Sequence, residues 1–330
     1  MLRLFANANY DFISLRWRAI WATVLVVVPG ILFLAIKGLN YSIEFTGGTL
    51  IQIHLQQPVP VGDLRSGLER AGIPGAEITQ FGSPLEFTIR ARVTRPGVDP
   101  NDTQATSDLV KNALESVVGA GQLNIVRTEA ASPKVSGELR QKAFLAIFLS
   151  FFAVLAYLAI RFEWRFGLAA VAATAHDIVA TIAFISVLRL EVSLTVVAAV
   201  LSMVGYSLND TIIIFDRVRE ILHKMKKESF VSILNRSINE TLPRSVLTHG
   251  TTLATLISLA FLGGEVIRPF ALVMFFGVFT GTFSSIFIAS PVLMWIEERW
   301  PSPAVRGHKM TAAGAVKAPG RSGKPQPAGR

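Results

Sequence analysis

The side chains most able to do chemistry lie in and just after an otherwise apolar run, residues 192–215. On a helical wheel at about 100° per residue, its polar side chains fall within an arc of roughly 120°. They are Ser202, Tyr206, Asn209, Asp210, Asp216 and Arg217, with Gly205 at the edge of the arc. The opposite side is mostly apolar. The pattern predicts a helix with one polar stripe facing other protein and an apolar back.

Asp210 lies well inside this run, where a carboxylate costs about 2.5–3.5 kcal/mol on an insertion scale. Burial disfavours the charged form, so this carboxyl group could switch its charge state, as a proton relay requires. The alternative is a structural carboxylate held by a neighbouring helix. For Asp216 and Arg217, near the end of the run, the alternative is an interfacial ion pair or a snorkelling side chain.

A second polar stripe is predicted in residues 166–188, where His176 and Asp177 are adjacent. Asp177 shares a helical face with Thr174 and Thr181, at spacings of three and four residues. The pair could belong to a proton path or could be a structural hydrogen-bonded pair. A metal-dependent hydrolase would need further ligands, and the 5 His residues are scattered over the chain. The sequence therefore predicts no metal site.

Arg244 opens the apolar run of residues 245–262. An arginine stays protonated in proteins, so Arg244 could hold Asp210 or Asp177 ionised and release it when the helices move apart. The alternative is a positive anchor on the cytoplasmic side of the membrane.

Small residues predict where helices pack closely. Gly277, Gly281 and Ser285 place a small residue at every fourth position of the last apolar run, which is typical of a helix–helix contact in a membrane. Gly205 is assigned to the same kind of contact.

Several chemistries are excluded. The chain has no Cys, so it forms no disulfide, thiolate metal site or cysteine nucleophile. It also lacks a phosphate-binding Gly-x-x-x-x-Gly-Lys-Ser/Thr loop and a Gly-x-Ser-x-Gly elbow. We expect a protein without its own ATPase and without a bound cofactor.

Membrane helices must position these residues. Of 330 residues, 51% are hydrophobic and only 17% charged, against about a quarter charged in soluble domains. Spanning helices need about 20 apolar residues, and six runs are candidates: 16–37, 143–160, 166–188, 192–215, 245–262 and 270–296. Lys and Arg gather in the connections after the second and fourth runs, so that face and both termini are expected to be cytoplasmic. The first run is interpreted as an uncleaved anchor rather than a secretory signal peptide.

Residues 38–142 differ in character and predict one α+β domain outside the cytoplasm. The expected strands are 41–45, 49–55, 76–81, 85–93 and 123–126, and the expected helices are 62–71 and 102–118. After a leading extra strand, this order matches the ferredoxin-like split motif. The fold class is thus a six-helix polytopic membrane protein with one ferredoxin-like extracytoplasmic domain. Its expected parts are 1–37, 38–142, a five-helix bundle at 143–300 and a disordered basic cytoplasmic tail at 301–330.

Residues 205–220, Gly-Tyr-Ser-Leu-Asn-Asp-Thr-Ile-Ile-Ile-Phe-Asp-Arg-Val-Arg-Glu, closely resemble a signature of the SecF family. SecF is the smaller membrane subunit of the SecD–SecF accessory translocase. Four other stretches resemble the family in the right order: 43–48 (Ile-Glu-Phe-Thr-Gly-Gly), 175–177, 239–244 and 277–291. Where the family has Gly-Thr-Tyr-Ser-Ser, residues 281–285 read Gly-Thr-Phe-Ser-Ser. The resemblance extends to about Trp300.

The resemblance implies a resistance–nodulation–division protein of the bacterial inner membrane that pairs with SecD and assists the SecYEG channel and SecA. It implies that proton flow moves the extracytoplasmic domain, which pulls or holds the translocating unfolded polypeptide, with Asp210 and Arg244 on the proton path. Membrane lipid is the other expected partner, and no specific nucleic acid is expected. The main alternative is a proton-driven small-molecule or lipid exporter of the same superfamily. An intramembrane hydrolase built on His176 and Asp177, or a passive scaffold, are further alternatives.

Overall fold

The computed structural model of the chain describes residues 5, 8–80, 83–91, 103–131, 133–225 and 228–306. The chain divides into two compact units. The helical unit comprises Met1–Ala35, Val154–Phe184 and Ser202–Arg330, and the sheet unit comprises Ile36–Ala153 and Ile185–Leu201. Helices α1, α5, α6 and α7 each contribute residues to both units, and each unit is described by itself below.

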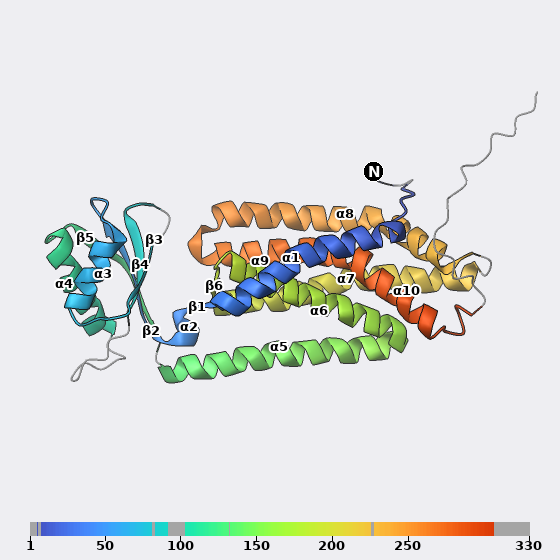
Figure 1. Ribbon diagram of the computed structural model, residues 1–330, viewed down its shortest axis with the longest axis horizontal. Helices are drawn as coiled ribbons and strands as arrows, with labels where there is room; N and C mark the ends of the chain where they lie inside the picture. Colours follow the sequence, from blue (N-terminus) through green and yellow to red (C-terminus); the bar gives the residue numbers. More distant parts are fainter. Residues whose placement is uncertain are drawn as a thin grey trace, which may run out of the picture. The chain divides into compact units, whose positions relative to one another are not determined.

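Six helices in the described residues are long and apolar enough to cross a membrane. They are α1 (Arg16–Lys37), α5 (Pro133–Arg161), α6 (Trp164–Val187), α7 (Leu194–Lys224), α8 (Phe230–Leu262) and a last helix, Val266–Arg299 (Figure 1). The last helix consists of α9 (Gly264–Ser284), a π-helical turn (Ser285–Ala289) and α10 (Ser290–Arg299). A 3-10 turn, Ile13–Leu15, precedes α1.

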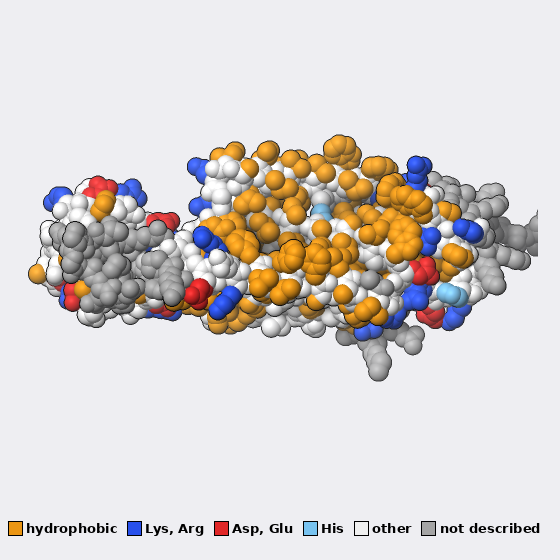
Figure 2. Space-filling view, turned by 90° about the horizontal axis from the view of Figure 1, so that it is seen from below, with side chains coloured by type: hydrophobic (Ala, Val, Ile, Leu, Met, Phe, Trp, Pro, Cys, Tyr) orange, Lys and Arg blue, Asp and Glu red, His pale blue; other side chains and the backbone are white. Residues whose placement is uncertain are grey.

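Four of the six predicted apolar runs lie wholly within these helices, whereas Leu188, Val192 and Ser193 of the runs 166–188 and 192–215 lie outside them. Several helices extend beyond their runs. Helix α5 begins at Pro133 rather than near Ala143, and α8 begins at Phe230 rather than at Ser245. Figure 2 shows hydrophobic side chains covering the helical part on the face drawn, with charged side chains toward its ends. Hydropathy detects only the apolar stretch of a helix, because the polar turns at its ends have the composition of loops.

The α+β domain has the predicted split motif. Its elements are β2 (Gly48–Leu55), α3 (Val61–Arg70), β3 (Glu77–Gln80), β4 (Glu86–Ala91), α4 (Thr103–Val118) and β5 (Leu123–Ala131). The strand order is β3-β4-β2-β5, with every neighbouring pair antiparallel. Side chains of β2 alternate, and its buried set, including Ile51 and Ile53, packs into one core with Leu64 and Leu114 of the two helices. Both helices cover the same face of the sheet (Figure 1).

The prediction of a leading strand at Tyr41–Phe45 is wrong for all of these residues except Tyr41. Strand β1 (Asn40–Tyr41) pairs in parallel with β6 (Glu191–Val192) and does not join the four-stranded sheet. The chain then turns into a short helix, α2 (Ile43–Thr46), because the Ser42 carbonyl accepts the amides of Phe45 and Thr46. Gly47 and Gly48 follow with φ of 73° and 115°, a backbone that favours glycine.

Other boundaries differ by a few residues. Strand β5 continues to Ala131 instead of ending at Val126. The predicted positions Phe81, Arg92, Val93 and Asp102 lie outside the described residues. At the start of the predicted tail, Ser302 and Val305 are buried, and the Ser302 amide donates to Glu297 Oε2 at 2.7 Å. The tail from residue 307 onward lies outside the described residues.

The short segment 40–48, which we call the junction, holds several elements of the sheet unit together. The Glu44 carboxylate accepts the amide of Leu194, the first residue of α7, at 2.6 Å. Ser136 of α5 donates its hydroxyl to the Ile43 carbonyl at 3.1 Å. Arg90 of β4 forms ion pairs with Glu191 of β6 at 2.7 Å and Glu77 of β3 at 3.0 Å. The sheet is therefore tied to the turn that starts α7.

Candidate functional site

Asp210 is buried inside the helical unit, with 2% of its surface exposed. Its Oδ1 accepts a hydrogen bond from the Ser245 hydroxyl of α8 at 3.0 Å. Its Oδ2 has no hydrogen-bond partner in the described residues. The nearest charged or chargeable group is His249 of α8, whose Nδ1 lies 3.5 Å from Oδ2. The polar stripe predicted on α7 thus faces α8 at Asp210, and this carboxylate has one satisfied and one unsatisfied oxygen.

His249 was not selected as a site residue from the sequence. It is 4% exposed, and its Nδ1 lies 2.9 Å from the Thr282 hydroxyl of α9. Its ring lies 5.4 Å from the ring of Tyr206, whose hydroxyl bonds the Thr252 hydroxyl at 2.7 Å. The spacing of four residues from Ser245 to His249 puts both on one helical face, but only the packing of α7 against α8 shows that this face meets Asp210.

Arg244 is exposed and makes no hydrogen bond or ion pair with any described residue. Its charge attracts the Asp210 carboxylate without contact. In this conformation the sequence-predicted partners Asp210 and Arg244 are therefore neighbours that do not touch.

Asp177 forms a second buried site between α6, α7 and α9. It is 0% exposed, and its Oδ2 accepts hydroxyl hydrogens from Ser207 at 2.5 Å and from Ser284 at 2.6 Å. Its Oδ1 lies 3.0 Å from His176 Nδ1. The sequence did not indicate that these two serines bind Asp177, because a helical hydroxyl commonly bonds its own backbone. His176 thus lies within hydrogen-bond distance of Asp177, and the two serines connect Asp177 to α7 and α9.

The remaining predicted proton-path residues lie elsewhere. Asn209 is exposed and its side chain makes no hydrogen bond within the described part of the chain. Asp216 pairs with Arg161 at the end of α5, at 2.9 Å, in a half-exposed position. Arg217 is held by Glu220 and by Glu240 of α8. The placements of Asp216 and Arg217 agree with their alternative interpretation, in which they form ion pairs.

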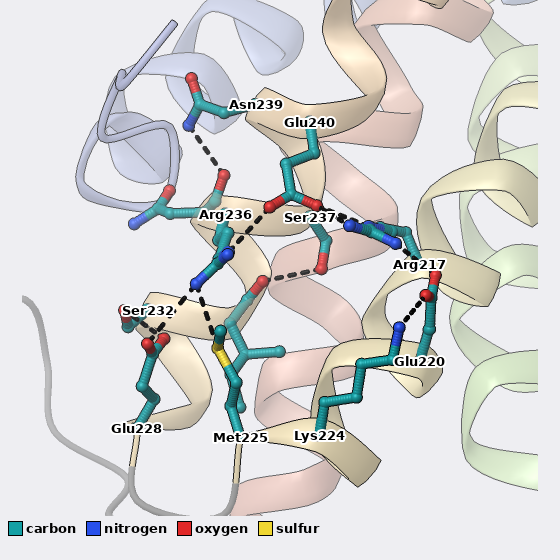
Figure 3. Close-up of polar contacts among 12 residues, drawn as sticks. Arg217, Glu220, Lys224, Met225, Glu228, Ser232, Arg236, Ser237, Asn239 and Glu240 are labelled. Carbon is teal, nitrogen blue, oxygen red and sulfur yellow. Dashed lines mark hydrogen bonds and ion pairs between the residues drawn. The ribbon is translucent and has the colours of Figure 1, made fainter. Parts of the chain in front are cut away.

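Figure 3 shows that Arg217 belongs to a larger ion cluster between the end of α7 and the start of α8. Glu240 also accepts from Arg236 at 2.8 Å, and Glu220 accepts from Lys224 at 2.6 Å. Arg236 in turn lies 3.7 Å from Glu228. Because both partners of Arg217, Glu220 and Glu240, belong to this cluster, Arg217 forms its ion pairs there and not with Asp210.

The predicted packing face on α9 contacts α7 closely. A Cβ added to Gly281 would lie 2.8 Å from Ser207 Cβ and 3.0 Å from Ser207 Cα, and one added to Gly277 would clash with Met203 Cγ. Ser285 bonds Thr211 through their hydroxyls at 2.8 Å. At Gly205, in contrast, a Cβ would meet no described atom within 4 Å. The stripe of small residues brings α9 against α7 beside Asp177, whereas Gly205 lies away from this contact.

The described residues contain no group of three His, Asp or Glu side chains that could hold a metal ion. What the site offers is carboxylates, imidazoles and hydroxyls between apolar helices. Such groups can accept, hold and release protons.

Comparison with known proteins decides the family. Residues 110–299 match the family described as protein export membrane protein SecD/SecF, C-terminal, and residues 32–59 match the SecD/SecF GG motif. The protein translocase subunit SecF of Gemmatimonas aurantiaca is 55% identical over 307 residues, 91% of each chain. The chain belongs to the SecF family. The SecF subunit of Magnetococcus marinus is 41% identical, over 90% of this chain and 95% of that one.

A solved SecDF structure supports the same assignment at the level of the fold. The crystal structure of SecDF, a translocon-associated membrane protein from Thermus thermophilus, aligns with a TM-score of 0.77 at 36% identity. The alignment covers 88% of this chain but only 39% of the SecDF chain. As a SecF-family member, the chain is a multi-pass membrane protein and a protein translocase subunit in protein export. This family is not known as an enzyme. The GG motif contains the junction glycines, Gly47 and Gly48.

Proposed function

We propose that this SecF-family subunit works with a SecD subunit and uses the proton-motive force to promote protein export through the SecYEG channel and SecA. The observation that carries the proposal is Asp210, a carboxylate buried at the apolar depth of α7 with one oxygen lacking a hydrogen bond in the described residues. A structural carboxylate would normally have both oxygens satisfied. Asp210 instead keeps an oxygen available to take up a proton.

The energy available from one proton is sufficient for such work. A charge crossing the membrane yields about 2.3 kcal/mol per 100 mV, and about 1.4 kcal/mol changes an equilibrium tenfold. Protonation of Asp210 removes its attraction to the Arg244 charge and to the His249 N–H. The contact of α7 with α8 then weakens, and the two helices can repack.

The route from Asp210 to the α+β domain is α7 itself. This helix is continuous from Leu194 to Lys224, and its first amide is held by Glu44 of the junction. A shift of α7 at Asp210 therefore reaches the residues that hold the sheet. In this proposal the domain lies outside the cytoplasm and moves with each proton cycle, pulling or holding the exported chain.

The distribution of charge supports the orientation. The α7–α8 connection and the ion cluster beside it are rich in Lys and Arg, including Lys224 and Arg236. Basic connections favour the cytoplasmic face. With six spanning helices, both termini then lie on that face of the bacterial inner membrane.

Exposed apolar surfaces on α1 and α5 support the membrane partners. In the apolar windows of these helices, only 11% and 6% of residues are buried within the chain. Surfaces of this kind contact either lipid or another membrane subunit. The name of the solved relative, SecDF, supports SecD as that subunit.

The experiment is proton-driven export into inverted membrane vesicles that contain the full-length chain and SecD. Asp210→Asn keeps the shape of the side chain but cannot gain or lose a proton. We expect the stimulation of export by the proton gradient to be lost, while export driven by ATP alone persists. Asp63→Asn, on the exposed surface of α3, is the matched control and should behave as wild type. Full proton stimulation in Asp210→Asn would refute the proposal.

A further inference from the structure

The proton on the His249 imidazole can be placed from its surroundings. Thr282 donates its hydroxyl hydrogen to the Val278 carbonyl of its own helix at 2.8 Å. A hydroxyl has a single hydrogen, so with that hydrogen on Val278 the Thr282 oxygen accepts at its second contact, His249 Nδ1 at 2.9 Å. Both contacts of Thr282 are then satisfied with the His249 hydrogen on Nδ1, and this is the tautomer we assign.

The same Nδ1 lies 3.5 Å from Asp210 Oδ2, the oxygen that has no hydrogen bond in the described residues. One N–H thus lies within reach of two acceptors, the Thr282 hydroxyl on α9 and the Asp210 carboxylate on α7. A small rotation of the ring would exchange one acceptor for the other. Both His249 and Asp210 are buried, so little water competes for this hydrogen bond.

We propose that His249 is the positioning partner of Asp210, donating its Nδ1–H to the carboxylate when Asp210 is ionised and returning it to Thr282 when Asp210 is protonated. This inference rests on the proposed function, because it requires Asp210 to change its charge. No covalent bond is exchanged in the imidazole, which stays neutral. The proton that neutralises Asp210 comes from the aqueous phase.

Arg244 does not fill this role in the present conformation, since it makes no contact with Asp210. The titratable or charged groups that act on the site are Tyr206 of α7, whose ring lies against His249, and Arg244 of α8, whose charge acts on Asp210. The Asp177 carboxylate is occupied by its serines. From α9, the group facing His249 is Thr282, which does not titrate. Among the described residues, only His249 offers Asp210 Oδ2 a hydrogen-bond donor within 3.5 Å.

The test uses His249→Phe, which removes the donor, and His249→Asn, which retains a side-chain N–H. Proton-driven export is measured across a pH series in vesicles that contain the full-length chain and SecD. Loss of the donor should slow export about tenfold near neutral pH, a change equivalent to about 1.4 kcal/mol. The pH profile should shift toward alkaline pH by about one unit, because a carboxylate without its donor ionises less readily. His249→Asn should recover part of both effects.

Two controls separate the possible outcomes. If Asp210→Asn keeps full proton stimulation, the proposed function fails, and this inference fails with it. If Asp210→Asn loses stimulation but His249→Phe keeps the wild-type rate and pH profile, the inference is overturned while the function stands. If thermal unfolding in detergent shows that a variant folds less stably than the wild type, the imidazole ¹⁵N spectrum of the wild-type chain decides instead.

That second measurement is the ¹⁵N spectrum of the imidazoles in the wild-type chain in lipid, with His249→Asn identifying the signal. We expect a neutral ring protonated at Nδ1, with a signal that shifts in Asp210→Asn. A ring protonated at Nε2 alone, or a signal indifferent to Asp210, would overturn the inference.

Discussion

Two buried carboxylates lie in the same helical unit, and their hydrogen bonds differ. Asp177 accepts two hydroxyl hydrogens on one oxygen and contacts His176 with the other. Asp210 accepts one hydroxyl hydrogen, and its other oxygen has no hydrogen bond in the part of the chain that is described. Asp177 is thus fixed between three neighbouring side chains, whereas one oxygen of Asp210 is left without a hydrogen-bond partner in the described residues. The geometry favours a structural role for Asp177.

A first prediction concerns Ser284. Ser284→Ala removes one of the two hydroxyls from Asp177, and hydrogen bonds to charged groups contribute about 1.5–3 kcal/mol. We expect the free energy of unfolding in detergent to fall by about that amount. Ser258→Ala is the control, because its exposed hydroxyl bonds only its own backbone at Ala254. A loss no larger than that of the control would show that the Asp177 cluster adds no stability.

At this scale the sequence predicted the acids but not their partners. Asp177 and Asp210 are conspicuous because a carboxylate inside an apolar run is costly. Their partners are not conspicuous in the sequence, since hydroxyls and histidines are tolerated in many helical positions. These partners are His249, Thr282, Ser207 and Ser284. Which of them meets an acid depends on helix rotation and crossing, and these are set by packing across the whole bundle.

At the scale of elements, α9 packs closely against α7 because two glycines on α9 leave room for the neighbouring helix. Gly277 and Gly281 lie against Met203 and Ser207 of α7. The spacing of small residues predicted this face, because close approach in a membrane requires side chains without bulk. Gly205 fits the same composition rule but faces no described atom, which shows that a small residue alone does not define a contact.

We expect Gly281→Ala to disturb this contact. Its new Cβ would lie 3.0 Å from the backbone at Ser207, which cannot move as a side chain does, and overpacking costs about 1–3 kcal/mol. Thermal unfolding of the chain in detergent measures the effect. Gly205→Ala, in α7, adds the same methyl group in open space and should not lower stability, because Ala has the higher helix propensity. Equal behaviour of the two variants would contradict the packing described here.

At the scale of the whole molecule, the junction connects the sheet to α7. The sequence predicted the split α+β motif, because alternating strands and amphipathic helices leave a local pattern. It did not predict α2 or the pairing of β1 with β6, since the partner strand lies far along the chain. The structure gives a physical reason for the motif at residues 43–48: Glu44 binds the start of α7, and two glycines adopt positive φ.

Glu44→Gln tests this connection. A carboxylate at a helix N-terminus is favoured by the helix dipole, and the neutral amide loses that term, worth about 0.3–1 kcal/mol at an exposed site. We expect faster hydrogen exchange at the Leu194 amide and weaker proton stimulation of export, with the α+β domain still folded. Glu69→Gln, on the exposed face of α3, is the control. Unchanged exchange at Leu194 would show that Glu44 does not hold α7.

The π-helical turn, Ser285–Ala289, sets the angular phase of the last helix. It fits an extra residue into one turn, and Ser290 marks it by donating its hydroxyl to the Ser285 carbonyl, five residues back. Gly281, before the turn, and Ser285, its first residue, face α7; Phe287 within the turn and Pro291 after it line a groove with Trp17 of α1. If the same residues were wound as regular α-helix throughout, α10 would be rotated by about 100°, the angle of one residue. The same helix could then no longer satisfy both neighbours at once.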